Sequence, residues 1–218
     1  MDLFRVERGV KANIYVDWRK RVMKRQAEII QSMSDHQVLI HLYITQLLLL
    51  ILSFILSWFF FDWETFLQLW HFELTDFMIF GAGSALTVLM IDFTLMRFVP
   101  EHWYDDGGIN KKIFRGRSIP HIFILCLLIA FCEELLFRGV IQTNFGLIVA
   151  SVIFAVLHVR YLAKKLLFVM VVLLSFFLGV LYELTQSLWV TIFSHFLINF
   201  VLAVKIRLDY LRANNDCY

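Results

Sequence analysis

The sequence predicts an all-α membrane protein: a polytopic transmembrane helical bundle of about six spans, preceded by a basic cytoplasmic N-terminal segment. Hydrophobic residues make up 60% of the 218 positions, whereas a soluble domain averages about 45–50%. The excess is too large for one buried core and indicates lipid as the solvent. Phenylalanine occurs 23 times while proline occurs only 2 times, so long helices are favoured over a loop-rich fold.

Six segments are apolar enough to cross a bilayer, because a spanning helix needs about 20 consecutive apolar residues. The predicted spans are Val38–Phe61, Asp76–Val99, Ile119–Gln142, Phe145–Tyr161, Leu166–Leu184 and Leu188–Ile206. The fourth of these segments is short. Residues 38–208 are therefore predicted to form the transmembrane helical domain, and residues 209–218 a cytoplasmic tail.

Basic residues predict how these spans are oriented. They gather in the N-terminal segment, in the links after spans two and four, and after span six, whereas the other links contain no Lys or Arg. This alternation fits the positive-inside rule with both termini in the cytoplasm. We therefore expect a multi-pass protein of the cell membrane, and specifically of a bacterial plasma membrane.

Residues 1–37 are expected in the cytoplasm or on the membrane surface. Their basic residues could meet anionic headgroups if this segment is a surface helix, and a simple topology signal is the alternative. The lipid bilayer is thus an expected partner, whereas no nucleic-acid partner is expected. The three cysteines form no spaced pairs, so we predict neither a disulfide framework nor a zinc site built on cysteine.

Span three holds two adjacent carboxylates and an arginine, which lipid would penalise unless they satisfy one another. An ionisable group in the bilayer core costs roughly 2.5–3.5 kcal/mol on insertion scales, and such residues are therefore functional suspects. Glu134 and Arg138 are spaced i and i+4, so we expect them to pair on one helix face. Glu133 lies about 100° around the helix and can face a cavity. A purely stabilising ion cluster is the alternative, but it gives Glu133 no role.

Two further spans contribute polar residues at a similar depth. Span four contains His158, while span six contains His195 and Asn199, which are spaced i and i+4 and share one face. Each has an ordinary explanation, because a lone histidine is often structural and polar pairs can join transmembrane helices. Counted inward at about 1.5 Å per residue, however, these residues and Glu133 all fall in the middle of the membrane. One carboxylate, two imidazoles and an amide suit peptide hydrolysis, which needs a base for water and donors for an oxyanion.

The ordered set of these residues resembles a known family. Glu-Glu-x-x-x-Arg at 133–138, Phe-x-x-x-His at 154–158 and His-x-x-x-Asn at 195–199 follow one another on successive apolar segments. In this order and spacing they resemble the CAAX-protease and bacteriocin-processing family of intramembrane endopeptidases, which includes the Ras-converting type of CAAX prenyl protease. The approach to the third motif is similar as well, with Gly179, Tyr182, Thr185, Ser187, Leu188 and Trp189. The resemblance covers about residues 119–202, which we take as the protease-like core.

The resemblance implies an activity and a role for each residue. The activity is hydrolysis of a peptide bond in a membrane-associated peptide or protein tail, which is the expected partner. Glu133 and His158 would activate water, and His195 and Asn199 would stabilise the oxyanion. The supporting ion pair would be Glu134 and Arg138.

The same residues leave a metal mechanism open. Glu133, His158 and His195 could supply a set of two histidines and one glutamate with an open position for water, and zinc would then be the cofactor. The sequence lacks a His-Glu-x-x-His motif, which would place two ligands on one helix. We therefore favour metal-free hydrolysis by the glutamate, without a cofactor.

Two other classes of protein are compatible with these features. A non-catalytic binding protein or a bacteriocin-immunity protein could keep the fold and act by sequestration. A proton-coupled transporter could use the buried ionisable residues as a relay. Because no pair of spans interrupted by Gly or Pro suggests an inverted repeat, transport ranks last.

Overall fold

A computed structural model gives the structure of the chain and describes residues 29, 32–158 and 164–215. The regular elements of these residues are all helices, so the predicted all-α bundle is confirmed. Most of the basic segment predicted at residues 1–37 lies outside the described residues, as do residues 216–218 of the predicted tail.

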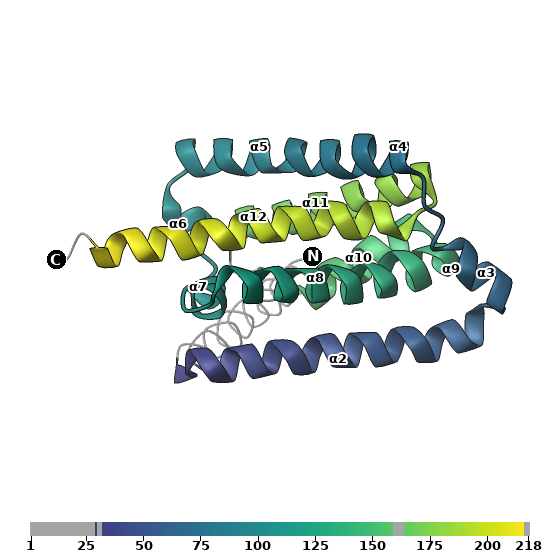
Figure 1. Ribbon diagram of the computed structural model, residues 1–218, viewed down its shortest axis with the longest axis horizontal. Helices are drawn as coiled ribbons and strands as arrows, with labels where there is room; N and C mark the ends of the chain where they lie inside the picture. Colours follow the sequence, from purple (N-terminus) through teal and green to yellow (C-terminus); the bar gives the residue numbers. More distant parts are fainter. Residues whose placement is uncertain (1–28, 30–31, 159–163, 216–218) are drawn as a thin grey trace, which may run out of the picture.

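Five helical segments of the described chain are long and apolar enough to span a membrane. They are α2 (Asp35–Phe60), the succession α4, η1 and α5 (Leu74–Asp76, Phe77–Ala82 and Gly83–Phe98), the succession α8, η2 and α9 (Ile119–Glu134, Leu135–Gln142 and Thr143–Phe145), α11 (Lys165–Thr185) and α12 (Leu188–Asn215). Short helices in the links are α3 (Trp63–Gln68), α6 (Glu101–Tyr104) and α7 (Ile109–Phe114). The long helices lie side by side, with α2 and α5 at opposite edges and α8, α11 and α12 between them (Figure 1).

The fourth predicted span, Phe145–Tyr161, differs in the structure, and its last three residues lie outside the described part. Phe145 ends the third span, and Gly146 then turns the chain with φ +84°, a conformation that glycine adopts without strain. The next helix, α10 (Leu147–Leu157), has 11 residues and covers about 16 Å, roughly half of the hydrocarbon core. It ends at His158, where the backbone leaves the helical conformation. The described part of this segment is therefore a half-length helix whose end carries a predicted catalytic residue.

The core of the bundle lies where α12 packs against α8, with α2 on another side of α8. Fully buried apolar side chains such as Ile122, Leu125 and Leu188 fill this core. The hydroxyl oxygens of Ser84 and Ser194 lie 2.8 Å apart and join α5 to α12. Small polar residues of this kind are typical of contacts between transmembrane helices, because they let the backbones approach closely.

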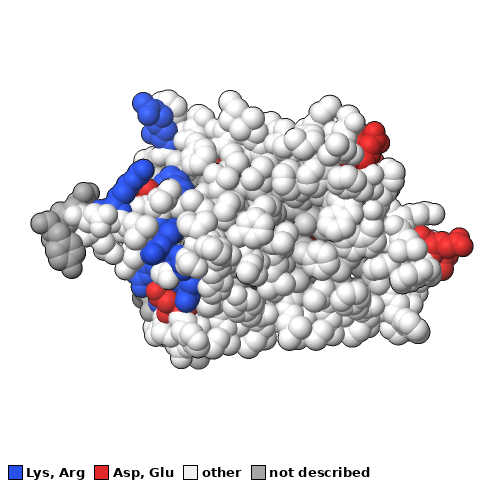
Figure 2. Space-filling view, viewed as in Figure 1, with Lys and Arg blue, Asp and Glu red and all other residues white. Residues whose placement is uncertain are grey.

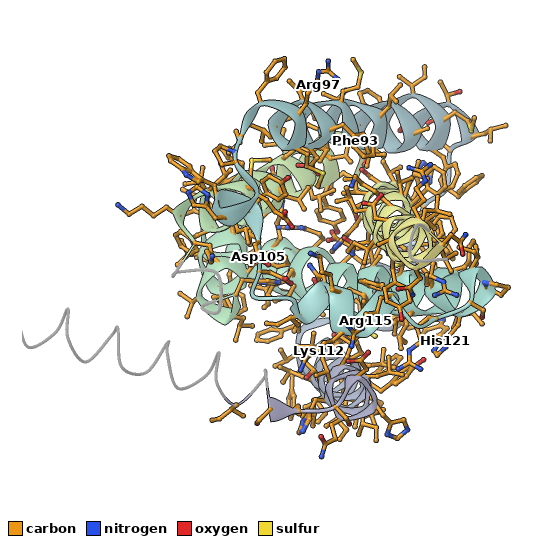
Figure 3. All side chains as sticks on the ribbon, turned by 90° about the vertical axis from the view of Figure 1, so that its left-hand side faces the viewer. Phe93, Arg97, Asp105, Lys112, Arg115 and His121 are labelled. Carbon is orange, nitrogen blue, oxygen red and sulfur yellow. The ribbon has the colours of Figure 1, made fainter. Side chains whose placement is uncertain are left out.

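The two ends of the bundle differ in charge. Lys and Arg side chains gather at one end (Figure 2), and a view onto that end places Arg97, Lys112 and Arg115 there (Figure 3). Arg115 makes two hydrogen bonds to the Asp35 carboxylate, of 2.9 and 3.0 Å, which tie the link after α7 to the start of α2. At the opposite end, the described residues 61–76 and 183–187 include five acidic residues and no Lys or Arg. The bundle is therefore polarised along its helices.

Candidate active site

The first motif lies where α8 changes into the π-helical segment η2. α8 ends at Glu134, and the backbone N–H of Leu135 reaches the carbonyl oxygens of both Phe131 and Cys132. π-Helical turns are rare and frequently occur at functional sites. The change of helix type falls in the middle of the third span, where Glu134 and Arg138 are both 0% exposed.

Glu134 is the centre of a buried charged cluster. Its Oε2 accepts from Arg138 Nε at 3.2 Å, so the ion pair expected from the i, i+4 spacing is present. Its Oε1 lies 2.8 Å from His195 Nδ1. Because an ionised carboxylate can only accept, this Nδ1 carries a proton and donates it. The sequence did not predict this second bond, which joins α8 directly to α12.

The other donors of Arg138 reach residues that sequence reasoning missed. One terminal nitrogen donates to Gln142 Oε1 at 3.3 Å, and the other donates to Ser175 Oγ at 3.1 Å on α11. Gln142 in turn donates through Nε2 to the carbonyl oxygen of Gly179 at 2.8 Å and to Glu183 Oε1 at 3.1 Å. The i, i+4 spacing of Arg138 and Gln142 was a usable signal, whereas nothing in the sequence singles out Ser175 as their partner.

The second motif is connected to this cluster through an aromatic ring. Phe154 stacks on His158 with ring centroids 4.2 Å apart, and it meets Phe137 edge to face at 4.8 Å. The Arg138 guanidinium lies 5.9 Å from the Phe154 ring centroid, within the range of a cation–π contact. His158 Nδ1 lies 2.8 Å from the Phe154 carbonyl oxygen. Since a carbonyl oxygen accepts, Nδ1 is the protonated nitrogen, and in the neutral ring the lone pair belongs to Nε2.

Glu133 and Asn199 are half-buried, in contrast to the enclosed Glu134. Glu133 precedes Glu134 on α8, and the Glu134 carboxylate is the one bonded to His195. Asn199 follows His195 by one turn of α12, as its i, i+4 spacing requires. The predicted residues therefore lie on α8, on η2, at the end of α10 and on α12, and Glu134 of α8 is hydrogen-bonded to Arg138 of η2 and to His195 of α12.

The described residues contain no group of three or more His, Cys, Asp or Glu side chains arranged to hold a metal ion. Glu133, His158 and His195, the set considered for zinc, do not form such a group. The Nδ1 of His195 is already bonded to Glu134, and the Nδ1 of His158 to the Phe154 carbonyl. Metal-binding histidines also make bonds of this kind with the ring nitrogen that does not bind the metal. We derive no step through a metal.

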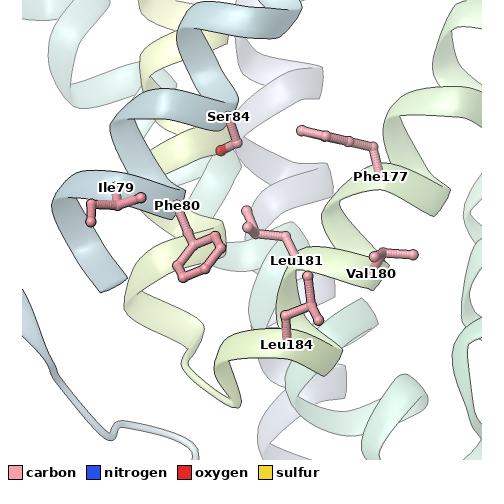
Figure 4. Close-up of a pocket in the computed structure, with 7 residues that line it drawn as sticks. All are labelled: Ile79, Phe80, Ser84, Phe177, Val180, Leu181 and Leu184. Atoms are coloured by element: carbon pink, nitrogen blue, oxygen red, sulfur yellow. The ribbon is translucent and has the colours of Figure 1, made fainter. Parts of the chain in front are cut away.

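A cavity of about 220 Å³ lies between η1, α5 and α11 (Figure 4). It is lined by Ile79, Phe80, Ser84, Phe177, Val180, Leu181 and Leu184. Six of these seven side chains are apolar, and no predicted catalytic residue is among them. That Glu133, His158 and His195 face one shared cavity therefore stays a prediction.

Comparison with known proteins places these motifs in a family. The model of the family described as "Type II CAAX prenyl endopeptidase Rce1-like" matches residues 115–201, which include all three motifs. The chain is also 50% identical over 171 residues to the "Uncharacterized protein YpbD" of Bacillus subtilis (strain 168), covering 78% of this chain and 90% of that protein. No solved structure matches the chain. The chain therefore belongs to the Rce1-like family of CAAX-protease-type membrane endopeptidases.

Proposed function

We propose that the chain hydrolyses a peptide bond in a membrane-associated peptide or protein tail, as an intramembrane endopeptidase. The observation that carries this proposal is the fully buried cluster of Glu134, Arg138 and His195. Ionisable groups are costly inside a membrane-spanning segment and mark functional sites. Here they come from the first and third motifs, and a stacked Phe154 links the second motif to them.

In this proposal Glu133 and His158 activate the hydrolytic water. Glu133 takes a proton from the water as the water oxygen bonds to the carbonyl carbon of the scissile peptide. The His158 imidazole orients the same water. When the carbon–nitrogen bond breaks, the proton passes to the leaving nitrogen, so the products are a carboxylic acid and an amine.

His195 and Asn199 then stabilise the oxyanion of the tetrahedral intermediate. The Asn199 amide donates directly. His195 already donates through Nδ1 to Glu134, so a donor at Nε2 requires the doubly protonated ring. The cluster of Glu134, Arg138 and His195 then carries one net positive charge, which suits a nearby developing negative charge.

We further propose that the protein lies in the cell membrane of a bacterium with its basic end, and hence both termini, in the cytoplasm. The segregation of Lys and Arg to one end of the bundle supports this orientation. The substrate is then a peptide or protein tail in or at the membrane. The proposed mechanism is of the glutamic type and needs no cofactor.

Mass spectrometry of membrane peptides tests the proposal in cells that differ only in this protein. Wild-type protein should generate new peptide termini that are absent with Glu133→Gln, His158→Ala, His195→Ala or Asn199→Ala, each inserted at the wild-type level. Losing one oxyanion donor typically lowers the rate about 100- to 1000-fold, and losing the base should cost at least as much.

Two results would change the assignment. If wild-type protein generates no new peptide termini and Glu133→Gln keeps the cellular phenotype, the chain acts as a binding protein and not as a protease. A chelator should leave the activity of purified protein intact, and loss of activity that zinc restores would replace the glutamic mechanism by a metal-dependent one.

A further inference from the structure

The guanidinium of Arg138 is held by three acceptors on three different segments. Its Nε donates to Glu134 at the end of α8, one terminal nitrogen to Gln142 at the end of η2, and the other to Ser175 on α11. A guanidinium is planar, with donors fixed in a fork. Three acceptors around that fork determine the plane of the group and not only its position. Glu134 alone, with one bond at Nε, leaves rotation about that bond possible.

Gln142 is itself oriented by the backbone of α11. Its Nε2 donates to the Gly179 carbonyl oxygen at 2.8 Å and to Glu183 Oε1 at 3.1 Å. Because both of these atoms only accept, the amide nitrogen must point toward α11, and Oε1 must point toward Arg138. The orientation of this amide is therefore determined by its neighbours.

Gly179 makes this close approach possible. A Cβ atom at this position would lie 3.0 Å from Gln142 Oε1, 3.2 Å from a terminal nitrogen of Arg138 and 2.2 Å from Leu147 Cδ1. Real Cβ atoms essentially never lie under 3.0 Å from another heavy atom. The glycine thus belongs to the same network as Gln142 and Ser175.

We infer that Gln142 and Ser175 are positioning residues for the peptide hydrolysis proposed above. They hold the Arg138 plane so that Glu134 presents Oε2 to Arg138 and Oε1 to His195. In this way they determine the orientation and the protonation of the His195 imidazole, without touching the substrate. The inference rests on the proposed function, because it assigns these residues a role in that reaction.

Steady-state kinetics of the purified protein, with a membrane peptide that it cleaves as the substrate, tests this inference. Gln142→Met keeps the side-chain length but removes both hydrogen-bonding atoms, and Ser175→Ala removes one hydroxyl. Because misplacement of a catalytic group by about 1 Å can cost about 100-fold, we expect kcat to fall roughly 10- to 100-fold in either variant. KM should stay within about threefold, and the pH profile of kcat/KM should shift, because the surroundings of His195 change.

Two matched variants separate positioning from general structural support. In Gln142→Glu, a protonated carboxyl can still accept from Arg138 and donate to Gly179, so kcat should recover toward wild type as the pH falls. Asn144→Ala is the control, because Asn144 is exposed and, within the described part of the chain, its side chain donates only to the Val140 carbonyl. Its kcat and pH profile should match wild type.

The outcomes distinguish this inference from the proposed function. If wild-type cleavage does not depend on Glu133, the proposed function fails. If cleavage depends on Glu133 but Gln142→Met and Ser175→Ala keep the wild-type kcat and pH profile per folded molecule, only the positioning role is overturned. The folded fraction is measured for each variant by size-exclusion chromatography, so a loss of protein is not mistaken for a loss of kcat.

Discussion

The charged side chain of Arg138 is 0% exposed, so its charge is stabilised by protein groups and not by water. Taking an ion out of water costs several kcal/mol even after the protein relaxes, and a good pair with further hydrogen bonds offsets that cost. Arg138 has these bonds, because Glu134, Gln142 and Ser175 accept from three of its nitrogens. Removing the arginine leaves Glu134 as a buried carboxylate with only His195 beside it.

We therefore expect Arg138→Ala to lower the free energy of unfolding by about 3–5 kcal/mol. Lys205→Ala is the matched control, because Lys205 and Asp209 also form an i, i+4 pair but are 42% and 50% exposed. An exposed pair typically contributes about 0–1 kcal/mol. Reversible unfolding in mixed detergent micelles measures both losses. Equal losses in the two variants would contradict the buried pair.

The pairing of Glu134 with Arg138 could be predicted from the sequence, because i, i+4 spacing on one helix determines it. The bond from His195 to Glu134 could not be predicted, because it depends on how α8 and α12 pack against each other. The spacing of residues along the chain predicted the members of the candidate site and one contact between them, that of Glu134 with Arg138. Contacts between segments, including those of Ser175 and Gly179, arise only from the packing of the bundle.

At the scale of the elements, α11 supports the site through its small residues. Ser175 and Gly179 are one turn apart and present a hydroxyl and a carbonyl oxygen to η2. A larger residue at Gly179 would press on the side chain of Leu147 on α10 and on those of Gln142 and Arg138 on η2. The π-helical form of η2 was not predicted. The fourth span was expected to be short, but the end of α10 at Leu157 was not predicted, because an apolar composition favours a helix without specifying its type or its end.

Gly179→Ala should therefore destabilise the protein. The added methyl would lie 2.2 Å from Leu147 Cδ1 and 3.0 Å from Gln142 Oε1, and overpacking of this kind costs about 1–3 kcal/mol. Gly83→Ala is the control, because a Cβ there meets nothing within 4 Å. Since alanine is the better helix former by roughly 1 kcal/mol, that variant should be as stable as wild type or more so. The same unfolding measurement compares the two, and a Gly179→Ala variant as stable as wild type would contradict tight packing at Gly179.

At the scale of the whole molecule, hydropathy and charge predicted the architecture better than they predicted the site. The five long helices correspond to five predicted spans, because length and apolar composition alone define a spanning helix. The start of α11 also agrees with the charge pattern, because Lys164 and Lys165 lie there, at the basic end. Lys164 donates a hydrogen bond to the His102 carbonyl of α6. The third span ends with α9 at the acidic end and α11 begins at the basic end, and helix α10 covers about half of the distance between them (Figure 1).

This polarity leads to the prediction that the basic end faces the cytoplasm. Glu73 and Gln186 are exposed at the acidic end, and Lys111 is exposed at the basic end. Each is replaced by cysteine in a Cys217→Ser background, because Cys126 and Cys132 are buried. A membrane-impermeant maleimide added to intact bacteria should label Glu73→Cys and Gln186→Cys but not Lys111→Cys.

Inverted membrane vesicles provide the complementary measurement. There the Lys111→Cys variant should be labelled, and the other two should be labelled only after the vesicles are permeabilised. The physical reason is that retaining Lys and Arg on the cytoplasmic side determines orientation, whereas acidic residues contribute little to it. Labelling of Lys111→Cys in intact cells would reverse the orientation. If Glu73→Cys and Gln186→Cys are labelled from opposite sides, the two residues do not lie on the same side of the membrane, and the proposed topology is wrong.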